Sequence, residues 1–181
     1  ATTGPNQAVA VNLVQFYGDL EGDGSLRYAE YEIVDTGATS PRACETGSGP
    51  ADCHLLGITR FITPILNPDI PAEKAASGST ESPLVDSILG YPDGTGVFRN
   101  PDQRPIFQLN YDTFGNLAFG ATTYVRSVEV DLTLQTVDKD PEVNDYRVIR
   151  MKSHIVPTNI NYAWGITLSG GSPQLPFQPT D

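Results

Sequence analysis

The longest pattern of alternating hydrophobic and polar positions lies between residues 124 and 156. Within it, residues 125–134 place valines and leucines on one face and charged or hydroxyl side chains on the other. A repeat of two residues is typical of a half-buried β-strand. A polar, turn-forming segment follows at 138–142, and residues 146–156 then read as a returning strand. The pattern predicts a long β-hairpin, around which we expect the rest of the chain to be organised.

The charges of this hairpin predict its register. One antiparallel register pairs opposite charges across the strands on one face and apolar residues on the other. The pairs are Asp131 with Arg150, Glu129 with Lys152, Leu132 with Ile149 and Val130 with Met151. An exposed cross-strand charge pair contributes only about 0.2–1 kcal/mol. We therefore expect the charges to select the register and the apolar face to supply most of the stability.

Four other segments are predicted to be strands because they are rich in β-branched and aromatic residues: 8–17, 26–34, 55–63 and 106–111. A dense cluster of Gly and Asp separates the first two, which should therefore form a first hairpin. Residues 159–168 are a further candidate for a short edge strand.

Two regions are rich in residues that disfavour long strands. Residues 67–105 are dominated by Pro, Gly, Ser and Asp, and we interpret them as an ordered surface loop. One short helix is predicted in this loop, over 71–76 or 83–89, since a leading Pro suits a first helical turn. The tail, residues 169–181, holds two adjacent glycines and three prolines, and is predicted to be extended and mobile on its own.

The expected fold class is thus mainly β, with antiparallel sheets built from long hairpins and little helix. The 181 residues, of which 39% are hydrophobic, suffice for one β-rich globular domain over residues 1–181, with an extended C-terminal tail from about residue 169. The 22 acidic and 11 basic residues give a net charge of -11. This charge opposes binding to nucleic acid and to anionic membrane surfaces.

No targeting or membrane segment is evident in the sequence. No apolar run approaches the roughly 18 residues that a transmembrane helix needs. Residues 1–7 have neither the basic start nor the apolar centre of a signal peptide. If the protein is exported, we expect this to be its mature chain.

The two cysteines, Cys44 and Cys53, enclose eight residues rich in Gly, Ser and Pro. We interpret the segment as a flexible loop closed by a disulfide, which the chain-entropy model values at roughly 2–3 kcal/mol. The alternative is a redox or metal pair, but the spacing is wide and His54 alone does not complete a zinc site.

An acidic turn imitates the spacing of a calcium-binding loop. It offers oxygen ligands at loop positions one, three, five and twelve, from Asp19, Glu21, Asp23 and Glu30, and Gly24 stands at position six. Ser25 is a further candidate ligand. The competing interpretation is a tight hairpin turn, which needs the same Asp and Gly residues for its backbone geometry. Calcium is the one cofactor that the sequence suggests.

No catalytic constellation is recognisable. His54 lies beside a cysteine and His154 lies inside a predicted strand, and neither is part of a nucleophile, metal or acid–base motif. The glycine-rich motifs for nucleotides and the serine-centred motif of hydrolases are missing. We therefore expect a protein that is not an enzyme.

The order of several segments resembles the globular head of type IV pilin-like minor subunits, namely PilW-like minor pilins and J-type minor pseudopilins. The segments are 16–26 with the Tyr-Glu-Ile strand after it, 83–88, 107–115, 125–136, and the closing strand with 157–160. Together they cover most of residues 11–160. The resemblance implies a filament subunit, exported across the inner membrane of a bacterium, which displays its β-rich head on an extracellular cell-surface filament.

The chain departs from this family in one respect. Such proteins normally begin with a leader and a long apolar helix that carries a glutamate, and neither is found here. Either the helix was removed, or the protein is a separate head that docks noncovalently on a short, helix-only pilin. Our working expectation is the second, with copies of the chain itself as further partners.

The contacts in such a filament are expected from the first strand and the tail. The residues proposed for this interface are Val9, Val11, Leu13, Leu175 and Phe177. The competing interpretation is that these positions are ordinary core and a loose end. An alternative function is a secreted β-sandwich binding module, with or without a stabilising calcium, that recognises a carbohydrate or protein through the loop 67–105.

Overall fold

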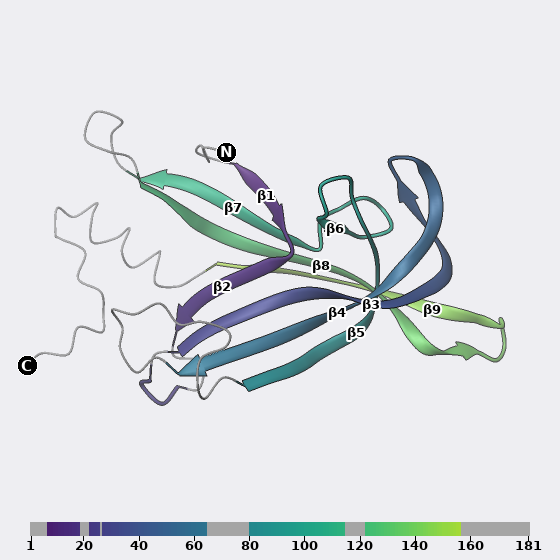
Figure 1. The fold of residues 1–181 in the computed structure, drawn as a ribbon, viewed down its shortest axis with the longest axis horizontal. Coiled ribbons are helices and arrows are strands. Elements are labelled where there is room, and N and C mark those ends of the chain that lie inside the picture. The colour runs from purple at the N-terminus through teal and green to yellow at the C-terminus, as the bar shows by residue number, and fades with distance from the viewer. Residues whose placement is uncertain (1–6, 19–21, 26, 65–79, 115–121, 157–181) are drawn as a thin grey trace, which may run out of the picture. The chain divides into compact units, whose positions relative to one another are not determined.

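The structure, a computed structural model of the 181-residue chain, describes residues 7–18, 22–25, 27–64, 80–114 and 122–156. Every regular element in these ranges is a β-strand, which confirms the prediction of a mainly β fold (Figure 1). The strands are β1 (Ala8–Val11), β2 (Leu13–Gly18), β3 (Arg27–Thr46), β4 (Gly49–Pro64), β5 (Thr80–Pro92), β6 (Phe98–Arg99), β7 (Phe107–Phe114), β8 (Thr122–Asp140) and β9 (Asp145–Ile155). Within the described ranges we find no helix with the length and hydrophobicity to cross a bilayer.

The strands form one sheet in the order β1-β7-β8-β5-β4-β3-β2, which β6 joins through β5 and β9 through β8. The registers from β2 to β6 and between β5 and β8 are all antiparallel. By its contacts the chain divides into two compact units. One comprises Ala1–Val9, Leu109–Glu129 and Ser153–Asp181, and the other Ala10–Gln108 and Val130–Lys152. The prediction of one domain over residues 1–181 stays a prediction.

In the first unit, β1 and β7 are linked through the backbone, where the N–H of Tyr111 donates to the carbonyl of Gln7 at 2.8 Å. The side-chain amide of Asn110 on β7 donates to Ser127 and Glu129 on β8, at 3.1 and 3.2 Å. Ser127 is buried, so the hydrogen bond from Asn110 satisfies a polar group that has left water.

The predicted first hairpin is confirmed as β2 paired with β3, with Phe16 opposite Ala29. The diagonal neighbours Phe16 and Tyr31 stack with ring centroids 5.8 Å apart. The predicted strand 8–17 is interrupted at Asn12, whose side-chain amide donates to the carbonyl of Gly96 and accepts from the N–H of Phe98, both at 2.8 Å. A polar side chain thus ends β1 by bonding to the segment that leads into β6.

Strands β3 and β4 pair over nearly their whole length, and register shifts between Asp35 and Ala38 and between Thr39 and Ala43 bend the hairpin (Figure 1). The predicted end of a strand near residue 63 is close to the observed end of β4 at Pro64. The core of the second unit lies against this hairpin. Its buried side chains are Ile33, Leu56, Ile58, Ile88, Ile106 and Phe107.

The interpretation of residues 67–105 as a loop with a short helix at 83–89 is wrong, because β5 and β6 lie in this region. The apolar residues of 83–89 have a spacing that fits both a helix and a strand buried on two faces. In the structure the run from Ile88 to Tyr91 is buried throughout. Gly90 within it is required by close packing, since a Cβ there would lie 2.7 Å from the backbone oxygen of Arg99. The alternative helix position, 71–76, and the candidate edge strand 159–168 lie outside the described residues.

Candidate docking surface

The disulfide between Cys44 and Cys53 is confirmed, with the two Cα atoms 5.1 Å apart. The segment between the cysteines is a β-hairpin and not the flexible loop that its composition predicts, because Cys44 pairs with Ala51 in the β3–β4 ladder. Both cysteines are completely buried and pack with Leu89 and Tyr91 of β5 in a second core cluster. The disulfide therefore crosslinks β3 to β4 near the turn of their hairpin, and the buried cysteines pack this end of the hairpin against β5.

The five proposed calcium ligands are not brought together among the residues that can be placed. Asp23 binds the N–H of Ser25 at 2.8 Å and the guanidinium of Arg27 at 2.9 Å, as a turn residue does. Glu30 is buried on β3 and accepts from the hydroxyl of Tyr28 at 2.8 Å. In the described part of the chain no group of His, Cys, Asp and Glu residues could hold a metal. Asp19 and Glu21 lie outside that part, so the calcium site stays a prediction.

The residues proposed for the filament interface are placed only in part. Val9, Val11 and Leu13 are half-buried, and Val11 packs against the core of the second unit. This placement agrees with the competing interpretation for Val11, namely that it belongs to the core. Leu175 and Phe177, as well as the tail 169–181, lie outside the described residues.

A different apolar surface is exposed on β9. Of the large hydrophobic side chains in the second unit, Ile149 is 57% exposed, Met151 55% and Val148 42%. Sequence reasoning assigned Ile149 and Met151 to a buried face, and this expectation is wrong. Among the described residues, the core and the half-buried side chains against it include members of β8 but none of β9.

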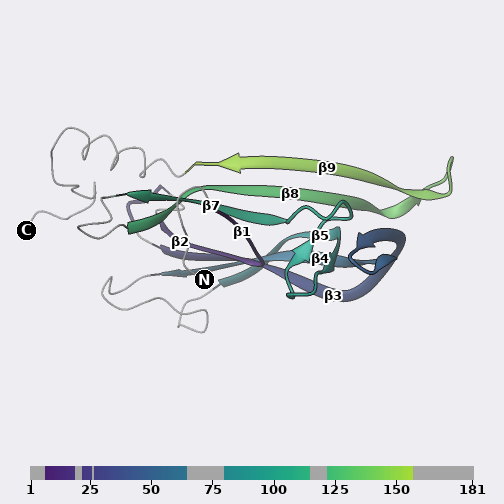
Figure 2. The same cartoon turned by 90° about the horizontal axis from the view of Figure 1, so that it is seen from above.

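The reason is the position of β9 in the sheet. It pairs with β8, and no described strand covers its other edge (Figure 2). The apolar side chains Val130, Leu132 and Leu134 of β8 reach the core. Among the residues that the structure describes, no second layer packs against the apolar side chains of β9, one strand further out. A hydrophobic pattern identifies which side chains share a face, but it does not say how far the core extends across that face.

β9 is nevertheless held firmly by an ion pair that the sequence predicted. Arg150 donates from Nε to Oδ1 of Asp131 at 2.9 Å and from Nη2 to Oδ2 at 2.7 Å. Its Nη1 donates to Asp102 at 2.8 Å. Hydrogen bonding to Asp131, which outweighs partial burial, raises the pKa of Arg150 above its ordinary value. Two parallel N–H···O bonds of this kind fix geometry as well as charge.

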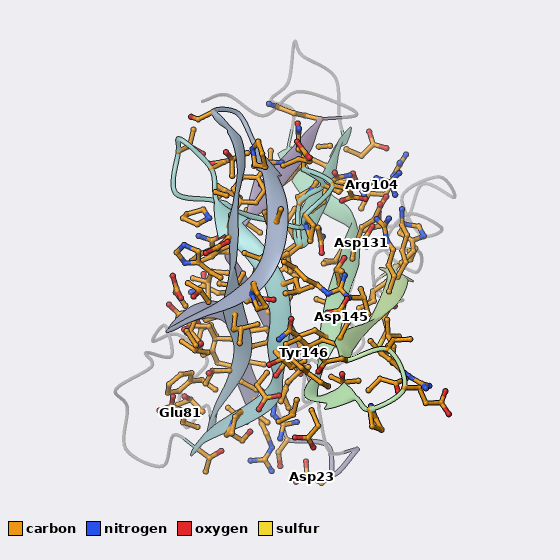
Figure 3. The ribbon with its side chains drawn as sticks, turned by 90° about the vertical axis from the view of Figure 1, so that its right-hand side faces the viewer. Asp23, Glu81, Arg104, Asp131, Asp145 and Tyr146 are labelled. Carbon is orange, nitrogen blue, oxygen red and sulfur yellow. A yellow bond between two sulfur atoms is a disulfide. The ribbon has the colours of Figure 1, made fainter. Side chains whose placement is uncertain are left out.

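Two ion pairs on β9 share an arrangement in which the carboxylate is covered and the cation is exposed. The side chain of Asp131 is 7% exposed and that of Arg150 40%. Asp140 is 8% exposed, and its partner Arg147 is 69% exposed. A molecule that approaches β9 therefore meets the guanidinium groups first. Figure 3 labels Asp131 on β8, with Asp145 and Tyr146 at the start of β9.

The segment of β8 behind this surface is supported by a buried side chain. Asn100 is fully buried, and its amide donates to the carbonyl of Asp131 at 2.8 Å and accepts from the N–H of Thr133 at 3.0 Å. The N–H of Asp131 donates to the carbonyl of Ile106 at 3.0 Å. The side-chain amide thus forms the hydrogen bonds to the backbone of β8 that a neighbouring strand would otherwise form at this point. Sequence reasoning missed Asn100, because a single Asn in a turn-rich segment carries no distinctive signal.

The arrangement is suited to binding a partner. It presents a rigid strand with exposed apolar side chains and outward-facing cations, next to an open backbone edge. No family model, no curated protein and no solved structure matches the chain. The function is therefore argued from the surface itself and from the resemblance of the sequence.

Proposed function

We propose that the chain is a structural subunit of a type IV pilus-like or pseudopilus filament, a surface head that docks noncovalently on a helical pilin partner. The order of sequence segments supports this proposal through its resemblance to minor pilin and pseudopilin heads. The mainly β fold and the buried disulfide are compatible with an extracellular head, because disulfides persist in oxidising compartments.

The single observation that carries the proposal is the exposed apolar face of β9. Ile149 and Met151 lie two residues apart on one side of a strand that Arg150 fixes to β8. Large apolar side chains that are exposed next to each other on a strand are typical of an interaction site. An amphipathic or apolar helix can cover such a face, as helices cover sheets within domains.

The alternative function, a secreted β-sandwich binding module, is supported less well. Its recognition element was the loop 67–105, but residues 80–92 and 98–99 of that range are strands. Fewer residues of the range 67–105 are therefore available to form a binding loop.

The test is electron cryo-microscopy of filaments sheared from the native cells, with mass spectrometry of their components. The proposal predicts this chain at a fixed ratio to a short, apolar, helical pilin. Replacing Ile149 by Asp should remove the chain from the filaments, whereas the control Val137→Ser, at a side chain that is 75% exposed, should leave it in place. If no filament contains the chain and it purifies as a monomer, the proposal is wrong, and carbohydrate and calcium binding become the next measurements.

A further inference from the structure

We propose that the open edge of β9 pairs with the N-terminal half of β5 in a second copy of this chain. The inference rests on the proposed filament role and names the contact that would join successive heads. It uses the backbone edge of β9, which is a different surface from the apolar face assigned above to the helical pilin. Addition of a strand to an open sheet edge is a common mode of association between chains.

The charge of β9 favours an acidic partner strand over a second copy of β9. Residues 146–152 contain Arg147, Arg150 and Lys152 and no acid, a charge of +3 in a chain of -11. Arg147 and Arg150 remain 69% and 40% exposed beside their own carboxylate partners, so a second β9 strand would add cations to a surface that already presents them. The occupant of this edge should therefore be an acidic strand.

β5 offers such an edge over residues 80–86. In this segment one edge of β5 pairs with β4. On its other edge, the described pairing with β8 is at Ile88 and the described pairing with β6 begins at Tyr91. Residues 80–86 therefore have no described partner strand on that edge. Residues 80–86 contain Glu81 and Asp86 and no base. Both acids are exposed, and Leu84 between them is 48% exposed.

The edge of β2, another open edge among the described strands of the second unit, fits less well. β2 stands at the end of the sheet order and exposes Gln15 and Phe16, but residues 13–18 hold no charged side chain. It offers nothing to complement the cations of β9. Pro83 is a further sign that this part of β5 is an edge, since Pro is confined in sheets to edge strands, strand starts and bulges.

One antiparallel register between β9 and β5 satisfies charge and hydrophobicity together. It sets Arg147 opposite Asp86, Lys152 opposite Glu81, Ile149 opposite Leu84 and Val148 opposite Val85. A parallel register can match the same charges, because both charged pairs are five residues apart. It would then place Arg150 opposite Leu84 and Ile149 opposite Pro83. The apolar pairs therefore favour the antiparallel arrangement.

The two edges are separate surfaces of one copy. Glu81 on β5 is labelled at the left of the view, apart from Asp145 and Tyr146 at the start of β9, which lie nearer its centre (Figure 3). A contact between different surfaces on identical chains is heterologous, so each new copy presents the same open edge as the last. Such a contact continues without limit unless it closes into a ring, as a filament requires.

Disulfide trapping on the full chain tests the pairing directly. The native cysteines are already bonded to each other, so introduced cysteines are distinguishable. A mixture of Ile149→Cys and Leu84→Cys chains should give a crosslinked dimer, whereas each variant alone should not. Met151→Cys mixed with Leu84→Cys is the matched control, because Met151 is as exposed as Ile149 but lies two residues out of register.

A charge reversal measures the same contact without cysteines. The double variant Glu81→Lys with Asp86→Lys should weaken self-association in sedimentation experiments at least about fivefold, since two cross-strand charge pairs change sign. Glu45→Lys with Asp52→Lys makes the same change of net charge at exposed acids of the β3–β4 hairpin. That control should leave association within about twofold of the parent chain.

The outcomes separate this inference from the proposed function. A crosslink from Ile149→Cys alone, no crosslink from the mixture, or equal weakening by both charge variants would overturn the β9–β5 pairing, even if filaments contain the chain. If the mixture crosslinks but native filaments lack the chain, the pairing stands and the proposed filament role falls.

Discussion

Arg150 on β9 and Asp131 on β8 form a bidentate ion pair in which the carboxylate is buried and the guanidinium is exposed. The pair connects a strand outside the core to one that packs against the core. It therefore determines whether β9 is a rigid surface or a loose end.

Removing the cation of this pair should be costly. Replacing Arg150 by Met leaves the carboxylate of Asp131, which is 7% exposed, without this partner, and we expect the protein to unfold at a lower urea concentration. The double variant Arg150→Met with Asp131→Leu should recover a large part of this loss, because no charge remains buried. Arg104→Met is the control, because it removes the cation of an exposed ion pair, in which Nε of Arg104 lies 3.6 Å from Oδ2 of Asp102. An equal loss in the single and double variants would contradict this account.

Asn100 gives a second prediction about the support of β8. Asn100→Asp keeps the size and the acceptor for Thr133 but removes the donor to the carbonyl of Asp131. It also buries a charge, so we expect a loss of about 3 kcal/mol or more in unfolding free energy at pH 7. The loss should shrink in acid, where the new carboxyl becomes protonated and can donate. A loss independent of pH would argue against the role assigned to the donor.

The alternation of hydrophobic and polar residues correctly predicted those features of the fold that are set by residues close together in the sequence. It predicted the mainly β fold and the first hairpin, and the charges predicted the pairing of Asp131 with Arg150. These follow from a repeat of two residues and from opposite charges that one register brings together.

The errors arose where a residue's environment is set by distant parts of the chain. Residues 83–89 form part of β5 because β4 lies beside them, and their own spacing does not distinguish a strand from a helix. Ile149 and Met151 are exposed because the core ends at β8. Neither the extent of a core nor the place of Asn100 beside β8 can be derived from a local pattern.

Asp93 gives a prediction about pH. The hydroxyl of Thr95, the guanidinium of Arg99 and the N–H groups of Thr95 and Val97 all bind its carboxylate. These bonds, first that of the Thr95 hydroxyl, outweigh burial and hold the pKa of Asp93 well below its usual range. The folded form therefore favours the ionised carboxyl. Its stabilising effect is complete above the unfolded pKa of about 3.9 and is lost as the pH falls towards the lower folded value.

The variant Asp93→Asn tests the contribution of the ionised carboxyl. It removes the charge and can place an NH2 donor where the carboxylate accepts from the guanidinium of Arg99. We expect it to lower the free energy of unfolding by about 1.5–3 kcal/mol at pH 7. The difference from the parent chain should narrow steadily below about pH 4. Asp52→Asn, at an exposed carboxyl of the β3–β4 hairpin, is the comparison. A difference that widens in acid would show that the sign assigned to Asp93 is wrong.

The disulfide should stabilise the second unit without being required for its fold. Replacing Cys44 and Cys53 by Ala should lower the unfolding free energy by about 2–3 kcal/mol from loop closure in the unfolded chain. Loss of buried sulfur contacts with Leu89 and Tyr91 should add to this figure. Because both cysteines are completely buried, we expect a thiol reductant to act slowly on the folded protein and quickly in urea. Rapid reduction under native conditions would show that the far end of the hairpin opens.

A last prediction separates surface from core by two comparable truncations. Ile149→Ser removes an apolar side chain that is 57% exposed, and it should change the unfolding free energy by no more than about 0.5 kcal/mol. Leu56→Ala, at a side chain with no exposure, should cost about 2–5 kcal/mol. If Ile149 serves a partner, its replacement should instead reduce recovery of the chain in filaments. A loss of stability comparable to that of Leu56→Ala would place Ile149 in a core of the isolated chain, and the face of β9 would then not be available for docking.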